Sequence, residues 1–570
     1  MKPKVLWTLA VIGLILFVYA QLVPALNSGS SEGGGTISKT KAVQAASDFA
    51  ANTLQFPDIR QDQADVTYAT LSDVYGYFSK ENLLTKYNEQ YSKQFPAELF
   101  RVKFKHPDNH LDALYVDVNM KDGNVVGFYG GEQWNKSVRD ELLKSAEGTA
   151  TVKSMEGDLT QEEKEKLAAP FVLALGFKPE QLQPADSGGV GLVYNVQGYK
   201  EGEAQGQLIF HFEYNKVSSL ESRFTVPASH TEYVNQQSKL ATWLTFGGYA
   251  FLSFILGILA IVYSARTRPY ASFKRGIFLT LFYLFINVAS TLNMLPAFEA
   301  EGISGATLTF AMVFQLMTTL VMTASIYFSL VGGDGLWREK GRNMWLRAQE
   351  AGYGSHVLRS ALNGYAWALI LLGVQSLIYV ALGLTLHTWS TTDETQSPYN
   401  MVYPWLFPLM AWMAGIGEEA VYRLFGIPML KKIVRSTFAA SLITTLIWAF
   451  GHTLYPIYPV VSRPIELTII GLLFSYIFLR HGYIAVMFAH VVFDSLLMGL
   501  SLITMGSAGN VLIGIITFAM PAIVGYLISV FRPSKPGTGT PGTTGTPGTI
   551  GTTGTQGSLS DRLDEGKPLY

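Results

Sequence analysis

About ten long apolar runs divide the chain, and they constrain its fold more than any other feature. The hydrocarbon core of a bilayer is about 30 Å thick, so a helix that crosses it needs about 20 apolar residues. Backbone groups in that layer must bond to one another, which favours helices. The runs therefore predict an all-α polytopic membrane bundle of about ten transmembrane helices. They begin near Val5, Leu240, Ile277, Ala306, Leu362, Tyr403, Phe438, Ile465, Tyr483 and Val511.

The composition agrees with a membrane protein and removes several classes of function. Hydrophobic residues make up 49% of the chain and charged residues only 15%, whereas about a quarter of the residues in soluble domains are charged. The net charge of −1 gives no basic surface, so nucleic acid is excluded as a partner. The chain has no cysteine, which excludes disulfides, thiolate zinc sites and cysteine nucleophiles.

Basic residues in the short loops predict which side of the membrane faces the cytoplasm. Lys and Arg cluster after the second, fourth, sixth and eighth spans, and the loops between these are acidic or neutral. This alternation places both termini in the cytoplasm and residues 28–238 outside it. A large outer domain without cysteine favours a multi-pass protein of a bacterial plasma membrane, with the lipid bilayer as its first partner.

The spans divide the chain into five predicted parts. The first span could be a signal peptide cleaved after Ala20, but its apolar run continues beyond that point, which favours an uncleaved anchor. The tail is rich in Gly, Thr and Pro and is expected to be disordered. The parts are an N-terminal membrane anchor (1–27), an extracytoplasmic α+β domain (28–238), transmembrane helices 2–5 (239–386), a catalytic transmembrane core (400–531) and the tail (532–570).

The outer domain repeats one pattern, a helix followed by strands. Alternating apolar residues and turn residues between the runs favour strands. The first unit has a helical pattern at 41–54 and strand patterns at 100–104, 114–118 and 125–129, and the second has a helix at 161–175 and strands at 191–196 and 207–212. The units 37–132 and 158–230 resemble tandem PepSY modules in this pattern alone.

Ionisable residues inside the spans carry the strongest functional signal. A charged side chain in a membrane helix costs about 2.5–3.5 kcal/mol on insertion scales, so each one requires a reason. The spans that begin near 5, 240, 277, 306, 362 and 511 contain essentially no charge. The charges concentrate in three other spans, as Glu418, Glu419 and Arg423 in the sixth, His452 in the seventh, and His490 and Asp494 in the ninth.

The spacing of these residues predicts how they pair. Glu419 and Arg423 are four residues apart on one helix face, which suits an ion pair, while Glu418 faces another direction. His490 and Asp494 have the same spacing and are expected to point into one cavity. A buried glutamate beside histidines can take a proton from water, and two histidines with a carboxylate also suit a divalent metal. The residues alone leave a hydrolase and a proton-coupled transporter equally open.

Three short motifs, in order, resemble the CPBP family of CAAX proteases and bacteriocin-processing enzymes, also called Abi. The chain reads EEAVYR at 418–423, where the family has EExxxR. It reads WAFGH at 448–452, where the family usually has FxxxH, and HVVFD at 490–494, where the family has HxxxN or HxxxD. The resemblance covers about residues 400–505. It implies an all-helical intramembrane endopeptidase similar to the type II CAAX prenyl endopeptidases.

The resemblance also implies a role for each motif residue. The first glutamate activates a water with help from the first histidine, and the second histidine with the aspartate completes the site and stabilises the oxyanion. The expected catalytic residues, which are also the candidate metal ligands, are Glu418, His452, His490 and Asp494. The residues expected to support them are Glu419, Arg423 and Trp448.

Two motif positions depart from the family pattern. Trp448 replaces the usual phenylalanine, which is a mild change among aromatic residues. Asp494 stands where the eukaryotic prenyl proteases have asparagine. An ionised aspartate cannot donate to an oxyanion, so Asp494 is expected either to be protonated or to have another role, such as metal ligation. The same ligands leave both a zinc-dependent and a metal-independent mechanism open.

The expected function is hydrolysis of a peptide bond in a membrane-associated protein or peptide precursor. The alternative is a non-catalytic membrane regulator or bacteriocin-immunity scaffold, although a scaffold needs none of these buried charges. A proton-coupled transporter ranks third once the three motifs are seen, and the inverted repeats that would favour it are not found in the sequence.

Overall fold

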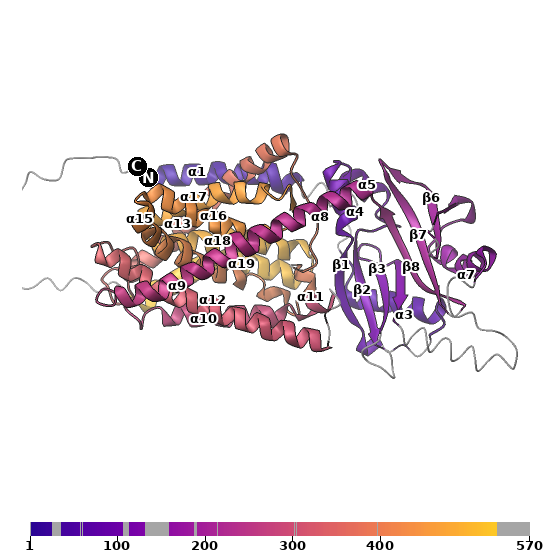
Figure 1. Ribbon diagram of the computed structural model, residues 1–570, viewed down its shortest axis with the longest axis horizontal. Helices are drawn as coiled ribbons and strands as arrows, with labels where there is room; N and C mark the ends of the chain where they lie inside the picture. Colours follow the sequence, from indigo (N-terminus) through magenta and orange to yellow (C-terminus); the bar gives the residue numbers. More distant parts are fainter. Residues whose placement is uncertain are drawn as a thin grey trace, which may run out of the picture.

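A helical body and a β-sheet domain lie end to end in the computed structural model (Figure 1). The N-terminal helix begins at the end of the helical body that lies farthest from the sheet domain. The structure describes residues 2–24, 36–56, 59, 61–105, 113–131, 159–186, 188, 191–213, 215–300, 303, 305–395 and 397–532. The predicted tail therefore lies outside the described residues, apart from its first residue.

The helical body contains a helix at each of the ten predicted spans. Its described residues include three π-helical segments, namely η1 (Val18–Leu22), η5 (Leu244–Ala250) and η8 (Glu419–Gly426), of which η5 and η8 each join two α-helices. The α-helices are α1 (Pro3–Phe17), α8 (Ala228–Trp243), α9 (Phe251–Arg266), α10 (Ile277–Asn293), α11 (Leu295–Ala300), α12 (Gly305–Glu339), α13 (Tyr353–Leu386), α14 (Leu409–Glu418), α15 (Ile427–Val434), α16 (Thr437–Phe450), α17 (Ser462–His481), α18 (Tyr483–Thr504) and α19 (Ala508–Phe531).

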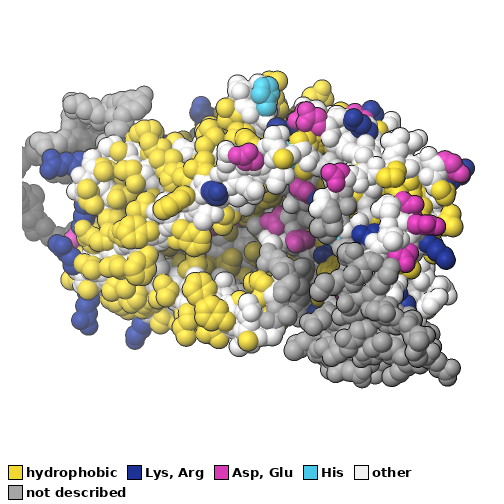
Figure 2. Space-filling model, turned by 45° about the vertical axis from the view of Figure 1, so that its right-hand side comes forward, with side chains coloured by type: hydrophobic (Ala, Val, Ile, Leu, Met, Phe, Trp, Pro, Cys, Tyr) yellow, Lys and Arg dark blue, Asp and Glu magenta, His cyan; other side chains and the backbone are white. Residues whose placement is uncertain are grey.

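Among the described residues, seven helices are long and apolar enough to cross a membrane. The apolar helices α10 and α16 are shorter, and the helix from 409 to 434 carries the charges of the first motif. Hydrophobic side chains cover the visible face of the helical body, with Lys and Arg gathered at the end away from the sheet domain (Figure 2). A multi-pass membrane bundle is therefore confirmed, whereas the count of ten and the orientation stay predictions.

Helix α1 is a packed part of this bundle. A Cβ on Gly13 would lie 2.2 Å from the carbonyl oxygen of Leu369, and one on Gly373 would lie 2.3 Å from the Cα of Gly13. Such a close crossing requires small residues. The side chain of Gln21 also donates a hydrogen bond to Ser376 at 2.7 Å. This contact between the first span and α13 was not predicted, because the two helices are far apart in the sequence.

The sheet domain is built from two halves that share one antiparallel sheet of eight strands among the described residues. The strand order is β1-β2-β3-β4-β8-β7-β6-β5, so two four-stranded meanders meet where β4 pairs with β8. The first half contains α3 (Lys39–Asn52), β1 (Asp65–Thr70), α4 (Ser72–Lys80), α5 (Leu84–Gln90), β2 (Glu98–Lys105), β3 (Ala113–Asn119) and β4 (Val125–Gly130). The second contains α7 (Gln161–Ala174), β5 (Leu182–Ala185), β6 (Leu192–Glu201), β7 (Ala204–Glu213) and β8 (Lys216–Thr225).

The predicted helices and strands of this domain all occur, and the repeat of a helix followed by strands is present. The elements that the pattern did not indicate are β1, β5, β8, α4 and α5. Strand β8 is polar along much of its length, and β5 contains Pro184, which an edge strand tolerates. The resemblance to PepSY modules and the extracytoplasmic location stay predictions.

Candidate active site

The seven predicted site residues come together inside the helical body on four segments. Glu418 ends α14, Glu419 and Arg423 lie in η8, and α16 carries Trp448. His452 follows the end of α16, and His490 and Asp494 lie on α18. The π-helical segment at the first motif is notable, because π-helices are rare and often occur at functional sites.

Glu419 links two other residues of the site through one oxygen. Its Oε1 accepts a hydrogen bond from Nη1 of Arg423 at 2.9 Å and lies 2.8 Å from Nδ1 of His490. The side chains of Glu419 and Arg423 are fully buried. An ionised carboxylate can only accept, so Nδ1 of His490 carries a proton and the orientation of the ring is fixed. Glu419 therefore orients His490 as well as pairing with Arg423, as in the predicted ion pair.

Arg423 is enclosed by aromatic rings and by a glycine of α17. Its guanidinium lies 4.7 Å from the ring centre of Trp448 and 5.5 Å from that of Phe474. Its Nη2 donates to the carbonyl oxygen of Gly471 at 3.3 Å. A Cβ on Gly471 would lie 2.9 Å from that nitrogen, so a larger residue would displace the arginine.

The Nε2 of His490 faces two partly exposed carboxylates. It lies 3.9 Å from Oε2 of Glu418 and 3.5 Å from Oδ2 of Asp494. These separations exceed a good hydrogen bond and suit a bridging water or substrate oxygen. The Glu418 side chain is 28% exposed and that of Asp494 is 20% exposed, against 0% for Glu419. The site is thus open on the Glu418 side and closed behind Glu419.

Trp448 makes a specific polar contact in this site. Its indole nitrogen donates a hydrogen bond to Oε2 of Glu418, which a phenylalanine could not do. Its carbonyl oxygen lies 3.0 Å from Nδ1 of His452 and can only accept, so this histidine also carries its proton on Nδ1. Nε2 of His452 is then free to receive a proton. The two rings meet edge to face, with centres 5.1 Å apart.

A second buried charge pair lies next to His452 and was not singled out from the sequence. On α17, Nη1 of Arg463 donates to Glu466 at 2.8 Å, and Gln375 donates to the same carboxylate at 2.9 Å. The guanidinium of Arg463 lies 5.2 Å from the ring centre of Tyr455, which stacks on His452 at 5.9 Å. The position of Glu466 inside a predicted span was the signal that could have identified this pair.

The candidate metal ligands do not form a metal cage. Among the described residues, no three His, Asp or Glu side chains are grouped so that they could hold a metal ion. The first histidine bonds to a backbone carbonyl, and Nδ1 of the second is engaged by Glu419. The residues as they lie therefore do not form the zinc site that their types allow.

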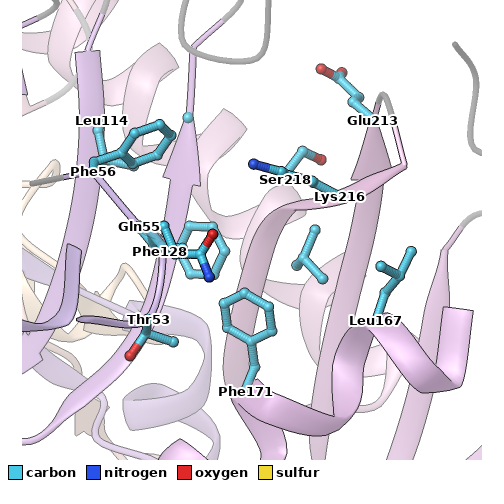
Figure 3. A pocket seen from close by; sticks show the side chains of 13 residues that line it. Thr53, Gln55, Phe56, Leu114, Phe128, Leu167, Phe171, Glu213, Lys216 and Ser218 are labelled. Carbon is cyan, nitrogen blue, oxygen red and sulfur yellow. The ribbon is translucent and has the colours of Figure 1, made fainter. Parts of the chain in front are cut away.

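The sheet domain contains a separate cavity of about 170 Å³ where its two halves meet. Phe56, Leu114 and Phe128 of the first half face Leu167 and Phe171 of the second across it (Figure 3). The cavity is lined mainly by apolar side chains, and none of the seven motif residues contributes to it. The chemistry of this chain therefore centres on the cluster in the helical body.

Comparison with known proteins agrees with the motifs. No curated protein and no solved structure matches the chain. A family model matches residues 400–496, a stretch that contains all seven motif residues. Its description is type II CAAX prenyl endopeptidase Rce1-like, and the match confirms that this part of the chain resembles that family of proteases.

Proposed function

We propose that the protein is an intramembrane endopeptidase that hydrolyses a peptide bond in a membrane-associated protein or peptide precursor. The observation that carries the proposal is the pairing of two partly exposed carboxylates, Glu418 and Asp494, with the oriented Nε2 of His490. A scaffold without catalysis needs no such group of buried and partly exposed charges.

The proposed reaction starts with Glu418 as the general base. Glu418 removes a proton from a water while the water oxygen attacks the carbonyl carbon of the substrate. The proton then passes to the leaving amine as the carbon–nitrogen bond breaks, which regenerates the carboxylate. The hydrogen bond from Trp448 holds the carboxylate in place, and the free Nε2 of His452 assists proton transfer.

His490 and Asp494 are proposed to stabilise the tetrahedral intermediate. A protonated His490 donates from Nε2 toward the oxyanion, and its charge is supported by Glu419 behind it. Asp494 Oδ2 lies 3.5 Å from the same nitrogen, so it favours the protonated form without itself donating to the oxyanion. With these roles an ionised Asp494 does not need to donate to the oxyanion, although it stands where the eukaryotic prenyl proteases have asparagine.

The proposed setting is a bacterial plasma membrane, with both termini in the cytoplasm and the sheet domain outside. This orientation follows from the basic loops and agrees with the position of the sheet domain at one end of the helical body. The outer domain is proposed to be modulatory, because the chemistry-bearing cluster lies in the membrane.

A proteomic comparison tests the proposed function directly. Membranes of cells that produce wild-type protein, Glu418→Gln or Glu339→Gln are compared for uncleaved precursors and their truncated products. Glu339 is the matched control, because it is a partly exposed carboxylate that pairs with Lys432 at 3.4 Å. At least one precursor is expected to accumulate with Glu418→Gln alone. Identical peptide sets in all three samples would contradict the proposal.

Replacing Trp448 by the phenylalanine that is usual in the family is expected to slow cleavage. The change removes the hydrogen bond to Glu418, and a hydrogen bond to a charged group contributes about 1.5–3 kcal/mol, or roughly 10-fold or more in rate. Trp412→Phe is the control, since Trp412 packs edge-on against Phe488 away from the carboxylates. Cleavage kinetics of purified variants check the prediction, and equal rates for the two variants would contradict it.

A further inference from the structure

The helix that leaves the sheet domain runs directly beside the segment that carries His452. Strand β8 ends at Thr225 and α8 begins at Ala228. From there α8 and η5 continue into α9 as one helix of 39 residues (Figure 1). Along its path, Oε1 of Gln237 accepts a hydrogen bond from the backbone N–H of Val460 at 2.8 Å. Two elements that are far apart in the sequence are thus joined next to the site.

Thr453, the residue after His452, makes the central contact between them. Its hydroxyl lies 3.0 Å from the carbonyl oxygens of both Ala241 and Phe450, and 2.9 Å from the hydroxyl of Thr245. Thr453 is 1% exposed. A buried hydroxyl with these partners ties the two segments together, because removing it breaks a hydrogen bond that crosses from one segment to the other.

One glycine on each of the two segments allows this helix to approach closely. A Cβ on Gly451 would lie 2.6 Å from the ring of Tyr249, and one on Gly248 would lie 2.6 Å from the ring of Phe450. Both Gly248 and Tyr249 belong to the π-helical segment η5. The helix is therefore irregular at the point where it contacts the residues around His452.

The other side of the same segment is held by a short two-stranded sheet. Strand β10 (Ile457–Tyr458) pairs with β9 (Trp389–Ser390), and the rings of Trp389 and Tyr458 stack at 4.5 Å. The loop that contains β9 also reaches the sheet domain, where the amide of Asn400 bonds to the backbone N–H of Tyr68 at 2.6 Å and to its carbonyl oxygen at 2.8 Å. The segment after His452 thus contacts α8 on one side and β9 on the other.

We propose that Thr453 is a positioning residue that places His452 in the active site by tying it to α8, an inference that rests on the proposed peptidase activity. His452 lies just beyond the last residue of α16, where its backbone N–H still bonds to the carbonyl oxygen of Ala449 at 3.1 Å, and the contacts of Thr453 with α8 fix the residue that follows it. A displacement of about 1 Å in a catalytic group can reduce a rate about 100-fold. The helix that leaves the sheet domain therefore contributes to the geometry of the site.

Kinetics of full-length Thr453 variants test this role. The substrate is a quenched-fluorescent peptide that spans the cleavage site mapped in the membrane proteome. Thr453→Val is expected to lower kcat about 10- to 100-fold with little change in KM, because the substrate still binds while His452 is displaced. Thr453→Ser keeps the hydroxyl and is expected to restore kcat to within about threefold of wild type. Thr444→Val is the control, since the hydroxyl of Thr444 bonds only to carbonyl oxygens of its own helix among the described residues.

The two ways of failing are distinguishable. Glu418→Gln is measured in parallel, and if it cleaves as fast as wild type the proposed function itself is wrong. If Glu418→Gln is inactive while Thr453→Val matches Thr444→Val, or if serine fails to rescue, the positioning role of Thr453 is wrong.

A crosslink provides a second measurement, in which a covalent bond replaces the lost hydrogen bond. The chain has no cysteine, so Thr245→Cys with Thr453→Cys introduces the one pair that can form a disulfide. In the reduced state kcat is expected to fall as in Thr453→Val, and mild oxidation is expected to restore it because α8 is tied to the segment again. An oxidised pair that stays as slow as the reduced pair would overturn the proposal.

Discussion

Glu418→Gln is expected to lower the cleavage rate by about 10²–10⁴-fold, because the water loses its general base. Glutamine is nearly isosteric with glutamate and still offers an oxygen to the indole of Trp448, so the hydrogen bond between them can persist. Glu418 pairs with no arginine or lysine among the described residues, and its side chain is 28% exposed. The fold is therefore expected to survive, and thermal unfolding in detergent should match wild type within about 1 kcal/mol.

This combination of a stable fold and a lost activity separates the proposal from its alternatives. The measurement requires purified protein, a peptide-cleavage assay and an unfolding curve for each variant. Glu339→Gln controls for the loss of one carboxylate. Near-wild-type turnover by a correctly folded Glu418→Gln would rule out Glu418 as the base and favour the non-catalytic scaffold or a site centred on Glu419.

Local spacing predicted those parts of the site that lie within one helix. Glu419 and Arg423 are one turn apart, and the structure forms the ion pair expected from that spacing. His490 and Asp494 likewise lie on one face of α18, where Nε2 of His490 is 3.5 Å from Oδ2 of Asp494. The cost of charge in a membrane also indicated that these residues belong together, because each needs a polar neighbour to be tolerated.

Contacts between helices were not predictable from one sequence. Glu419 and His490 are 71 residues apart, and Trp448 and Glu418 are 30 apart, so no helical period relates them. Whether two side chains on different helices meet depends on crossing angles and on small residues such as Gly471, which only the packed structure defines. For this reason Trp448 was interpreted as a mild aromatic exchange, and Glu419 was assigned a supporting role without its bond to His490.

In the sheet domain, too, an element whose conformation depends on a distant partner was not predicted. Strands with clear alternation, such as β2 and β3, were predicted close to their observed bounds. Strand β8 was not predicted, although it joins the two halves of the sheet, where Leu220 pairs with Phe128 of β4. Its strand conformation depends on the partner β4, which is a tertiary effect that overrides local preference.

The buried pair of Glu419 and Arg423 provides the second large effect. Removing one partner of a buried ion pair costs about 3–5 kcal/mol, because the other charge is left without compensation. Glu419→Met and Arg423→Met are therefore each expected to lose about that much stability in detergent unfolding. The double variant replaces both charges by apolar groups of similar volume, which is often nearly neutral, so most of the stability is expected to return.

Activity is expected to respond differently from stability in these three variants. In the double variant Nδ1 of His490 has lost the Glu419 oxygen that lies 2.8 Å away, so the ring is no longer oriented toward Glu418 and Asp494. The double variant should therefore be stable but remain impaired in cleavage, as expected when an orienting partner of a catalytic histidine is removed. A double variant that regains both stability and activity would reduce Glu419 to a structural partner of Arg423. Single variants as stable as wild type would show instead that removing one partner does not leave the other charge buried and unpaired.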